Sequence, residues 1–319
     1  MPLFKQEKQH IPSSLLKDRY GWPPFSVLNT ISWDWQRRKD EWEKLFKDST
    51  VGRDVKRYNA TPTNIFSARG ADAKVAESVS EFDPYLCELL TRWFTVPGKS
   101  ALILDPFAGG CVRGVVAAVL GHHYFGIDIS PEQVSANRIQ YESIQKRYVD
   151  ISGTAKWWQG DAFEVLEEMY EPCDFVLTCP PYYNLERYTD LAGDLSNMPT
   201  YEEFLNRYAE ILRMAAYLLG DDCFFVIVVS EIRASASEIK DSYYRGFVAD
   251  TTKILQNVPG LHYYNALVLE NALGSLPVRA PKYFDQTRKI GRHHQNILVF
   301  YKGNPENIEK KFGKYTAEL

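Results

Sequence analysis

The stretch Thr178-Cys179-Pro180-Pro181-Tyr182 joins a short apolar run to two prolines and an aromatic ring. Proline has no N–H to donate to a neighbouring strand, so strand pairing has to stop there and the chain projects from the sheet. Two adjacent prolines leave carbonyl oxygens with no N–H between them, and such oxygens can accept hydrogen bonds from an exocyclic amino group. The ring of Tyr182 offers a flat face on which a base could stack. Taken alone, the stretch is equally explained by an ordinary proline turn packed by tyrosines.

Three earlier expected strands end in polar groups that a nucleoside needs. Residues 101–104 lead into the small-residue turn Asp105-Pro106-Phe107-Ala108-Gly109-Gly110, whose backbone N–H groups could approach a ligand closely. Asp128 lies about twenty residues further on, where an acid can accept hydrogen bonds from both ribose hydroxyls. The run 156–159 ends in Gly160-Asp161-Ala162-Phe163, which offers a carboxylate for an adenine amino group and a ring to pack on it. Capping explains each acid singly, but three in a row favour a nucleotide site.

The elements that position these residues alternate between strands and helices. Asp83 caps a helix that has Pro84 at its first position, and Ser130 caps another that begins at Pro131. We predict a seven-stranded, doubly wound α/β sheet, with ligands at the carboxyl ends of the strands and the last two strands antiparallel. The expected strands cover residues 101–104, 123–127, 156–159, 175–177, 223–229, 261–269 and 295–301.

Composition excludes several classes of protein. Hydrophobic residues make up 45% and charged residues 24%, as in ordinary globular domains, and the net charge of −4 gives no overall attraction to a polyanion. The five cysteines form no CxxC pair, which indicates reduced thiols and a cytoplasmic setting. No apolar run approaches the ~20 residues of a membrane span, and no signal-peptide core is visible. The pairs His122-His123 and His293-His294 lack supporting ligands, so we expect no metal centre.

Two segments are expected to flank the catalytic domain of residues 81–305, and one loop within the domain is distinguished by its charge. Residues 1–80 form an aromatic, mildly basic arm that includes a helix at 33–46 and packs on the body; DNA contact by Arg37, Arg38 and Lys39 is the alternative. Residues 306–319 form a polar tail. The polar loop 272–294 carries five basic residues against Asp285 alone, which favours contact with phosphates over a merely solvated face. The five are Arg279, Lys282, Arg288, Lys289 and Arg292.

In this order, the motifs resemble those of S-adenosylmethionine-dependent DNA methyltransferases of the amino-group class, which modify N4 of cytosine or N6 of adenine. The resemblance covers roughly residues 82–302: DPFAGG at 105–110 matches the cofactor loop, GIDI at 126–129 the ribose-binding acid, and CPPY at 179–182 the catalytic tetrapeptide. With the terminal HQNILVFYKG, the pattern is most similar to phage-borne DNA modification methylases.

The resemblance implies S-adenosylmethionine as cofactor, a Rossmann-like methyltransferase sheet, and double-stranded DNA as partner with the target base flipped out. Asp83, Asp128, Ile129 and Asp161, with the 105–110 loop, are then cofactor contacts. Thr178 to Tyr182 would hold the target.

Two departures from the family pattern matter. Cys111 stands where the cofactor loop usually has its last glycine. Cys179 replaces the Asp, Asn or Ser that normally accepts a hydrogen bond from the target amino group, and a thiol is a weak acceptor. Cys179 therefore also admits C5 modification of a pyrimidine, with the thiolate adding to C6. An RNA or protein target, and a binding module without turnover, are the remaining alternatives.

Overall fold

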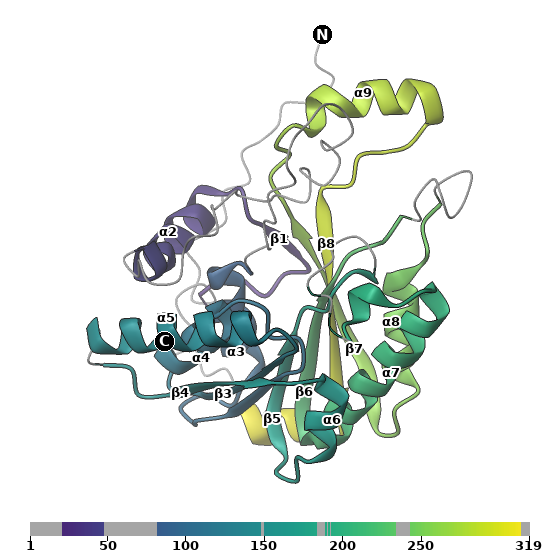
Figure 1. Cartoon of the computed structure of the whole chain (residues 1–319). Helices are drawn as coiled ribbons and strands as arrows, with labels where there is room; N and C mark the ends of the chain where they lie inside the picture. Colours follow the sequence, from purple (N-terminus) through teal and green to yellow (C-terminus); the bar gives the residue numbers. More distant parts are fainter. Residues whose placement is uncertain are drawn as a thin grey trace.

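The computed structural model describes residues 21–47, 82–147, 150–183, 189, 191, 193–233 and 243–313. Its centre is an eight-stranded sheet with the order β1-β7-β8-β6-β5-β2-β3-β4 (Figure 1). The strands, in chain order, are β1 (Val27–Asn29), β2 (Leu102–Asp105), β3 (His123–Asp128), β4 (Thr154–Gln159), β5 (Cys173–Thr178), β6 (Leu219–Val229), β7 (Leu261–Glu270) and β8 (His294–Lys302).

The predicted doubly wound, Rossmann-like sheet is confirmed, and β7 and β8 pair antiparallel as expected. The predicted count of seven strands is wrong, because β1 adds an eighth strand parallel to β7. β1 has only three residues, with one of them buried, so it is too short to show an alternating pattern in the sequence. β8 lies between β6 and β7 and is antiparallel to both, so β6 and β7 point the same way.

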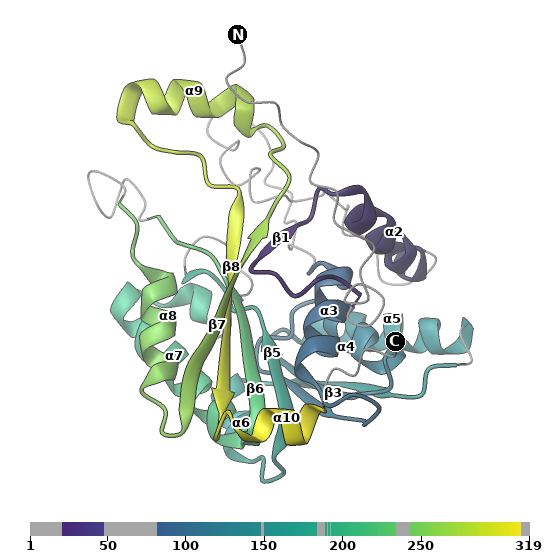
Figure 2. The same cartoon turned by 180° about the vertical axis from the view of Figure 1, so that it is seen from behind.

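Helices cover both faces of the sheet (Figure 2). Successive strand residues face opposite sides: Phe224, Val226 and Val228 belong to one hydrophobic core, whereas Phe225 and Ile227 belong to the other. The first core is covered by α3 (Pro84–Phe94), α4 (Val112–Val119) and α5 (Pro131–Arg147); the second by α6 (Ala162–Glu167), α7 (Tyr201–Leu218) and α8 (Phe247–Gln256). Within the described ranges, no helix is long and apolar enough to cross a membrane.

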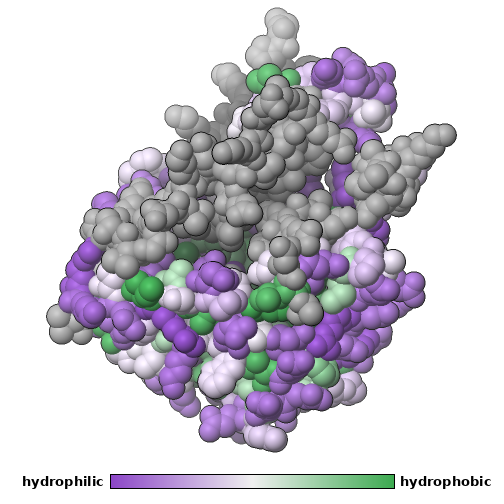
Figure 3. Space-filling model, viewed as in Figure 1, coloured by the Kyte–Doolittle hydropathy of each residue, from purple (hydrophilic) through white to green (hydrophobic). Residues whose placement is uncertain are grey.

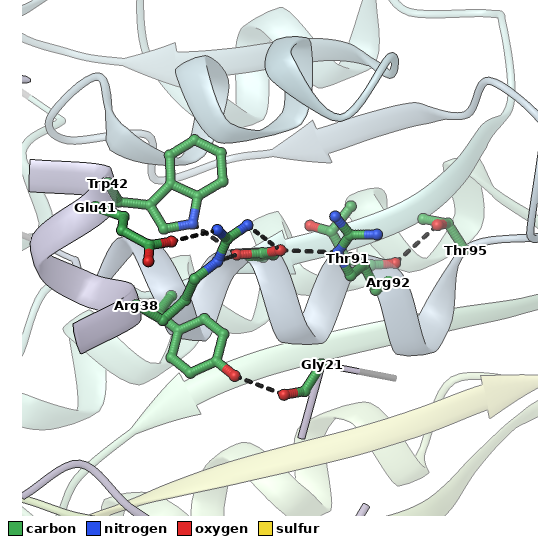
Figure 4. A network of polar contacts seen from close by, with 9 residues as sticks. Gly21, Arg38, Glu41, Trp42, Thr91, Arg92 and Thr95 are labelled. Carbon is green, nitrogen blue, oxygen red and sulfur yellow. Dashed lines mark hydrogen bonds and ion pairs between the residues drawn. The ribbon is translucent and has the colours of Figure 1, made fainter. Parts of the chain in front are cut away.

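An N-terminal helix, α2 (Trp33–Lys47), lies on α3 through one buried carboxylate (Figure 4). Glu88 on α3 accepts hydrogen bonds from Trp42 Nε1 at 2.6 Å and from Arg38 Nε and Nη2 at 2.9 Å each. Arg92 adds a fourth donor at 2.9 Å. Burial alone would raise the pKa of Glu88, but the hydrogen bonds from Arg38 and Trp42 outweigh it and lower the pKa. Arg38, named in the sequence as an alternative DNA contact, is thus used to hold α2.

The segment expected to be a polar loop contains a helix, α9 (Leu276–Thr287), which stands beyond the carboxyl end of β7 (Figures 1 and 2). Pro277 fits the first turn, where the backbone N–H has no helical partner. Pro281 lies inside the helix, where it removes a hydrogen bond, and it made the sequence resemble a loop. A short helix, α10 (Asn307–Phe312), follows β8 at the opposite end.

Candidate functional site

The carboxyl ends of four neighbouring parallel strands, β4, β3, β2 and β5, gather the predicted site residues at one edge of the sheet. The chain runs from β2 through β3 to β4 in one direction and then crosses to β5 on the other side of β2. In open α/β sheets, ligands bind in the crevice where the strand order reverses in this way. The switch lies between β2 and β5, which carry the glycine loop and the Cys-Pro-Pro-Tyr end.

The loop after β2 is shaped by glycine and by hydrogen bonds to β3. Gly109 has a φ of +50°, which side chains other than glycine adopt rarely, and nothing lies within 4 Å of where a Cβ would stand on Gly109 or Gly110. The N–H of Gly109 donates to Asp128 Oδ2 at 2.9 Å, and that of Ala108 donates to the Ile127 carbonyl at 2.9 Å. The loop therefore presents open backbone beside the end of β3.

Asp105 is fully buried and holds this loop from inside the protein. Its carboxylate pairs with the guanidinium of Arg113, itself buried, and accepts from Tyr124 Oη at 2.8 Å and Thr178 Oγ1 at 2.7 Å. Arg113 Nη2 also donates to the carbonyls of Phe107 and Ala108 at 2.6 and 2.9 Å. The Asp105 carboxylate faces the protein interior and positions the loop, and the cofactor contact predicted for Asp105 stays a prediction. Pro106 is buried beside it.

Asp128 ends β3 with both carboxylate oxygens turned to the loops. Oδ2 accepts from Gly109 and Oδ1 accepts from the N–H of Ser130 at 2.9 Å. Burial raises the pKa of Asp128 to about 6, with Asp105 and Asp194 adding to the rise and the two backbone hydrogen bonds opposing it. A carboxylate has about four acceptor positions, so two stay available for hydroxyl donors. Ile129 follows it and is half-buried.

Asp161, at the end of β4, caps α6 by accepting from the N–H of Phe163 at 2.8 Å. Its other oxygen pairs with Arg207 Nη2 of α7 at 2.9 Å, and the Arg207 guanidinium lies 4.5 Å from the centre of the Phe163 ring. Gly193 packs closely against the Asp161 carboxylate, because a Cβ on Gly193 would stand 2.7 Å from Asp161 Oδ2. Asp161 is thus capping and paired, and the contact with adenine predicted for it and for the half-buried Ala162 and Phe163 stays a prediction.

The end of β5 lies beside the glycine loop, because Thr178 is bonded to Asp105. Thr178 and Pro180 are buried, whereas Cys179, Pro181 and Tyr182 are partly exposed at the edge. Thr178 therefore holds the strand end, and the contact with the target predicted for it stays a prediction. The ring of Tyr182 meets Phe247 of α8 edge-on, with centroids 6.1 Å apart.

Tyr183 turns the chain back into the core after the tetrapeptide. It has a φ of 46°, which costs a bulky residue roughly 1–3 kcal/mol and persists only where the surroundings impose it. Its ring is buried against Tyr201 and Phe204, at 5.6 and 5.4 Å, and its hydroxyl donates to the Pro199 carbonyl at 3.3 Å. Backbone strain of this kind is concentrated at functional sites.

Two other predicted regions, Asp83 and the basic segment 272–294, lie apart from the four strand ends. Asp83 caps α3, accepting from the N–H groups of Tyr85 and Leu86, and also contacts Trp35 and Lys39 of α2, so the cofactor contact predicted for it is not tested by this geometry.

In the basic segment, Lys282 and Arg288 are exposed and Lys289 is partly exposed. Arg292 is different: its guanidinium donates to Ser230 Oγ, the His294 carbonyl and Asn296 Oδ1, and so ties the segment to β6 and β8.

Several site residues were not recognised in the sequence. Arg113, Arg207 and Glu231 stand in segments where a charged residue usually indicates a solvated face. The partners of the two arginines lie elsewhere in the chain, and Glu231 Oε2 has none among the described residues. Arg113 lies three residues past the glycine loop, which is the sequence signal that could have marked it. In the described part of the chain, no group of three His, Cys, Asp or Glu side chains could hold a metal ion.

The chain matches no protein-family model and no curated protein. Solved structures resemble it in fold. TrmN from Thermus thermophilus is 16% identical, with a TM-score of 0.43, and the match covers 69% of this chain and 49% of TrmN. Magnesium protoporphyrin IX methyltransferase (ChlM) from Synechocystis PCC 6803 with bound SAM is 17% identical, with a TM-score of 0.42, covering 80% of this chain and 97% of ChlM. A SAM-dependent methyltransferase from Agrobacterium tumefaciens is 16% identical, with a TM-score of 0.44, covering 72% of this chain and 65% of that protein.

The chain thus spans about half the length of TrmN. At these identities the likeness concerns the fold alone. The chemistry has to be argued from the residues at the carboxyl edge.

Asp105→Asn tests whether the buried ion pair holds the site. The amide leaves the buried Arg113 charge without its counterion, so we expect the free energy of unfolding to fall by about 3–5 kcal/mol, measured by chemical denaturation.

Asp174→Asn is the matched control, because Asp174 is exposed and accepts from the N–H of Leu102 at the other end of the sheet. We expect it to change stability by less than about 1 kcal/mol. An Asp105→Asn protein as stable as this control would contradict the role of the pair.

Proposed function

We propose that the chain is a methyltransferase that uses S-adenosylmethionine to methylate an exocyclic amino group of a base in DNA. The observation that carries this is the hydrogen bond of 2.7 Å between Thr178 and Asp105, which fixes the Cys-Pro-Pro-Tyr end of β5 beside the glycine loop of β2. A donor site and a target site have to adjoin for a direct group transfer, and positioning supplies much of the rate in such reactions.

The residues at β2 and β3 fit a nucleoside cofactor. Gly109 and Gly110 leave open space over their backbone, and the Asp128 carboxylate, partly removed from water, has free acceptor positions for two hydroxyls. These residues would hold the ribose, and the loop would lie along the remainder of the molecule. When bound, S-adenosylmethionine supplies a methyl group on a positively charged sulfur, which leaves as a neutral thioether.

The residues at β5 fit the amino group of a base. The Pro180 carbonyl can accept one of its hydrogens, which aligns the nitrogen lone pair, and the partly exposed Tyr182 ring can stack on the base. Flipping a base out of a duplex costs a few kcal/mol, and stacking on an aromatic ring offsets roughly 1–3 kcal/mol of this. The nitrogen forms the new N–C bond and then loses a proton to water.

DNA is the partner best supported by α9. This helix lies beyond the carboxyl end of β7, which is the same end as those of β5 and β6. Lys282 and Arg288 are exposed along it, and Figure 3 shows mainly hydrophilic residues over α9 in this view. A protruding basic helix over the target edge suits contact with phosphates, whose attraction does not require an overall basic protein.

C5 modification of a pyrimidine is the second candidate, and one observation favours it. Cys179 is partly exposed at the end of β5, beside the proposed target position, so its thiol could reach C6 of a bound pyrimidine. An RNA substrate would use the same stacking and acceptor groups.

Cys179→Ser separates the two reactions. If the amino nitrogen is the nucleophile, serine is a better acceptor than cysteine and the rate of methyl transfer is kept or raised. If the thiolate attacks C6, turnover falls by several orders of magnitude, because a serine hydroxyl is far too weakly acidic. We expect an active mutant, assayed by mass spectrometry of nucleosides from DNA and from RNA incubated with labelled S-adenosylmethionine.

A covalent complex of the parent protein with DNA containing a 5-fluoropyrimidine, together with an inactive Cys179→Ser protein that still binds cofactor, would support the C5 reaction instead. Methylated nucleosides from RNA alone would replace DNA as the substrate.

The raised pKa of Asp128 predicts how cofactor binding depends on pH. Hydroxyl donors favour the charged carboxylate, so binding lowers the pKa from its free value of about 6. Affinity should therefore be full above that pH and fall by up to about tenfold per unit below it, measured by calorimetry with S-adenosylmethionine. The fold itself is not lost through this group, because a raised carboxyl pKa favours the folded state as pH falls.

Asp128→Asn should weaken binding at neutral pH by about 1.5–3 kcal/mol and abolish the pH dependence. Unchanged affinity in the folded mutant would remove Asp128 from the cofactor site.

The triple variant Lys282→Ala, Arg288→Ala, Lys289→Ala tests the DNA contact. Each phosphate that is no longer neutralised should lower the slope of log affinity against log salt by about 0.9, so we expect weaker binding and a slope smaller by roughly 2–3 in titrations of duplex DNA. Cofactor affinity should not change.

The matched control removes three positive charges from the opposite edge of the sheet, at β4 and the end of α5. The variant Lys146→Ala, Arg147→Ala, Lys156→Ala should leave the slope unchanged. Equal slopes in both variants would mean that α9 is only a solvated helix.

A further inference from the structure

Glu231 lies at the target edge and has no part in the arrangement described so far. β6 is the parallel neighbour of β5, and their last paired residues are Ile227 and Thr178. Glu231 lies four residues beyond Ile227, as Tyr182 lies four residues beyond Thr178. Adjacent strands run about 4.8 Å apart. The end of β6 therefore brings Glu231 to the side of the tetrapeptide that faces away from the cofactor loop.

One oxygen of the partly exposed Glu231 carboxylate is buried in an unusual state. Its Oε2 is shielded from water and has no hydrogen-bond partner among the described residues. By contrast, the acids that are buried in the described part of the chain are all satisfied: Asp105 by Arg113, Glu88 by Arg38 and Trp42, and Asp194 by Ser196 and Thr189. A buried acceptor left unpaired costs about 1–3 kcal/mol, and more when charged. A group kept at such a cost at the mouth of a site indicates a ligand that completes it.

The surroundings of Glu231 come from the same cluster that shapes the tetrapeptide. Burial and the hydrogen bond of 2.9 Å to Asp250 raise the pKa of Tyr201, and the nearby Glu231 adds to the rise. The guanidinium of Arg245 lies over the rings of Tyr183 and Tyr201, at 5.1 and 4.7 Å from their centres. Glu231 therefore acts on Tyr201, whose ring packs against Tyr183 in the turn after Tyr182.

Because the thiol of Cys179 is a weak acceptor, the target amino group lacks a second good hydrogen-bond acceptor, and Glu231 can supply it. An exocyclic amino group has two hydrogens, and orienting its lone pair takes an acceptor for each of them. The Pro180 carbonyl is one, and the thiol of Cys179 is a poor second. A carboxylate oxygen is the strongest neutral-pH acceptor that a protein side chain offers, and charged acceptors form hydrogen bonds about twice as strong as neutral ones.

We propose that Glu231 accepts a hydrogen bond from the exocyclic amino group of the target base and thereby selects amino bases over keto bases. The inference rests on the proposed function and deepens it. A keto oxygen, as in thymine, offers no hydrogen and places its lone pairs against the carboxylate. Sites that bond a substrate group reject analogues lacking it, because the buried protein group is then left unpaired.

Methyl transfer tests the role in turnover. Labelled S-adenosylmethionine and mixed-sequence genomic DNA are the substrates. Glu231→Gln should lower kcat about 10- to 100-fold, with the KM for the cofactor within about twofold, because the group acts on the base in the transition state. Glu202→Gln, an exposed acid in the first turn of α7, is the control and should keep wild-type rates. An unchanged kcat in Glu231→Gln overturns the proposal while leaving the methyltransferase assignment intact; a wild-type protein without methyl transfer overturns that assignment.

Selectivity is measured without turnover, by fluorescence anisotropy with single-stranded 20-mers of dA, dC and dT. Wild type should bind dA or dC at least about tenfold more tightly than dT. Glu231→Gln should lose this preference, because an amide can rotate to present either a donor or an acceptor. Wild-type protein that binds all three equally, or none, overturns the proposal.

Thermal unfolding separates this role from a structural one. Glu231→Leu removes a buried oxygen that has no partner among the described residues, so its Tm should equal or exceed that of wild type. A Tm lower by several degrees would show that Glu231 supports the fold and would overturn the proposal.

Discussion

The buried pair of Asp105 and Arg113 is the interaction on which the site depends. One carboxylate receives Arg113 from α4, Tyr124 from β3 and Thr178 from β5, while the same guanidinium holds two carbonyls of the glycine loop. Burying two charges is unfavourable unless nearly every donor and acceptor is matched, so only one geometry of the loop satisfies the set. The glycine loop and the end of β5 are thereby fixed relative to each other before any ligand binds, which is the condition for catalysis by positioning in the proposed reaction.

How much of this could be predicted from the sequence follows from how local each signal is. The strand ends at residues 105–110, 128 and 179–182 are recognisable because an apolar run and its polar terminus are adjacent in the chain. The contacts that shape the site are not local: Thr178 meets Asp105 across 73 positions, and Arg207 meets Asp161 across 46. The hydrophobic periodicity of the sequence does not predict such pairs. The helix α9 was missed for a different reason, because Pro281 argues against a helix wherever tertiary structure does not override it.

In the N-terminal arm, too, the sequence does not show which distant residues the charged side chains contact. Arg38 and Lys39 resemble a nucleic-acid contact in the sequence, since clustered basic residues are the usual mark of one. In the structure Arg38 is bound to Glu88 and Lys39 lies 3.4 Å from Asp83, so both link α2 to the start and middle of α3. A basic residue that contacts DNA and one that forms an ion pair within the protein look alike in the sequence. They differ in whether an acid from another segment lies close by in the fold. That acid is buried on α3, 50 residues away from Arg38.

The two halves of the carboxyl edge differ in how completely their polar groups are satisfied. On the cofactor side, Asp105 and Asp161 have partners and Asp128 is held by two backbone N–H groups. On the target side, Tyr183 keeps a strained backbone and Glu231 keeps a buried oxygen with no partner among the described residues. Strain and unsatisfied groups lower stability, so they persist where a ligand or a function compensates for them. Under the proposed function, the difference indicates a rigid half that is formed in advance and a second half that is completed only by its substrate, which is where discrimination between bases is best made.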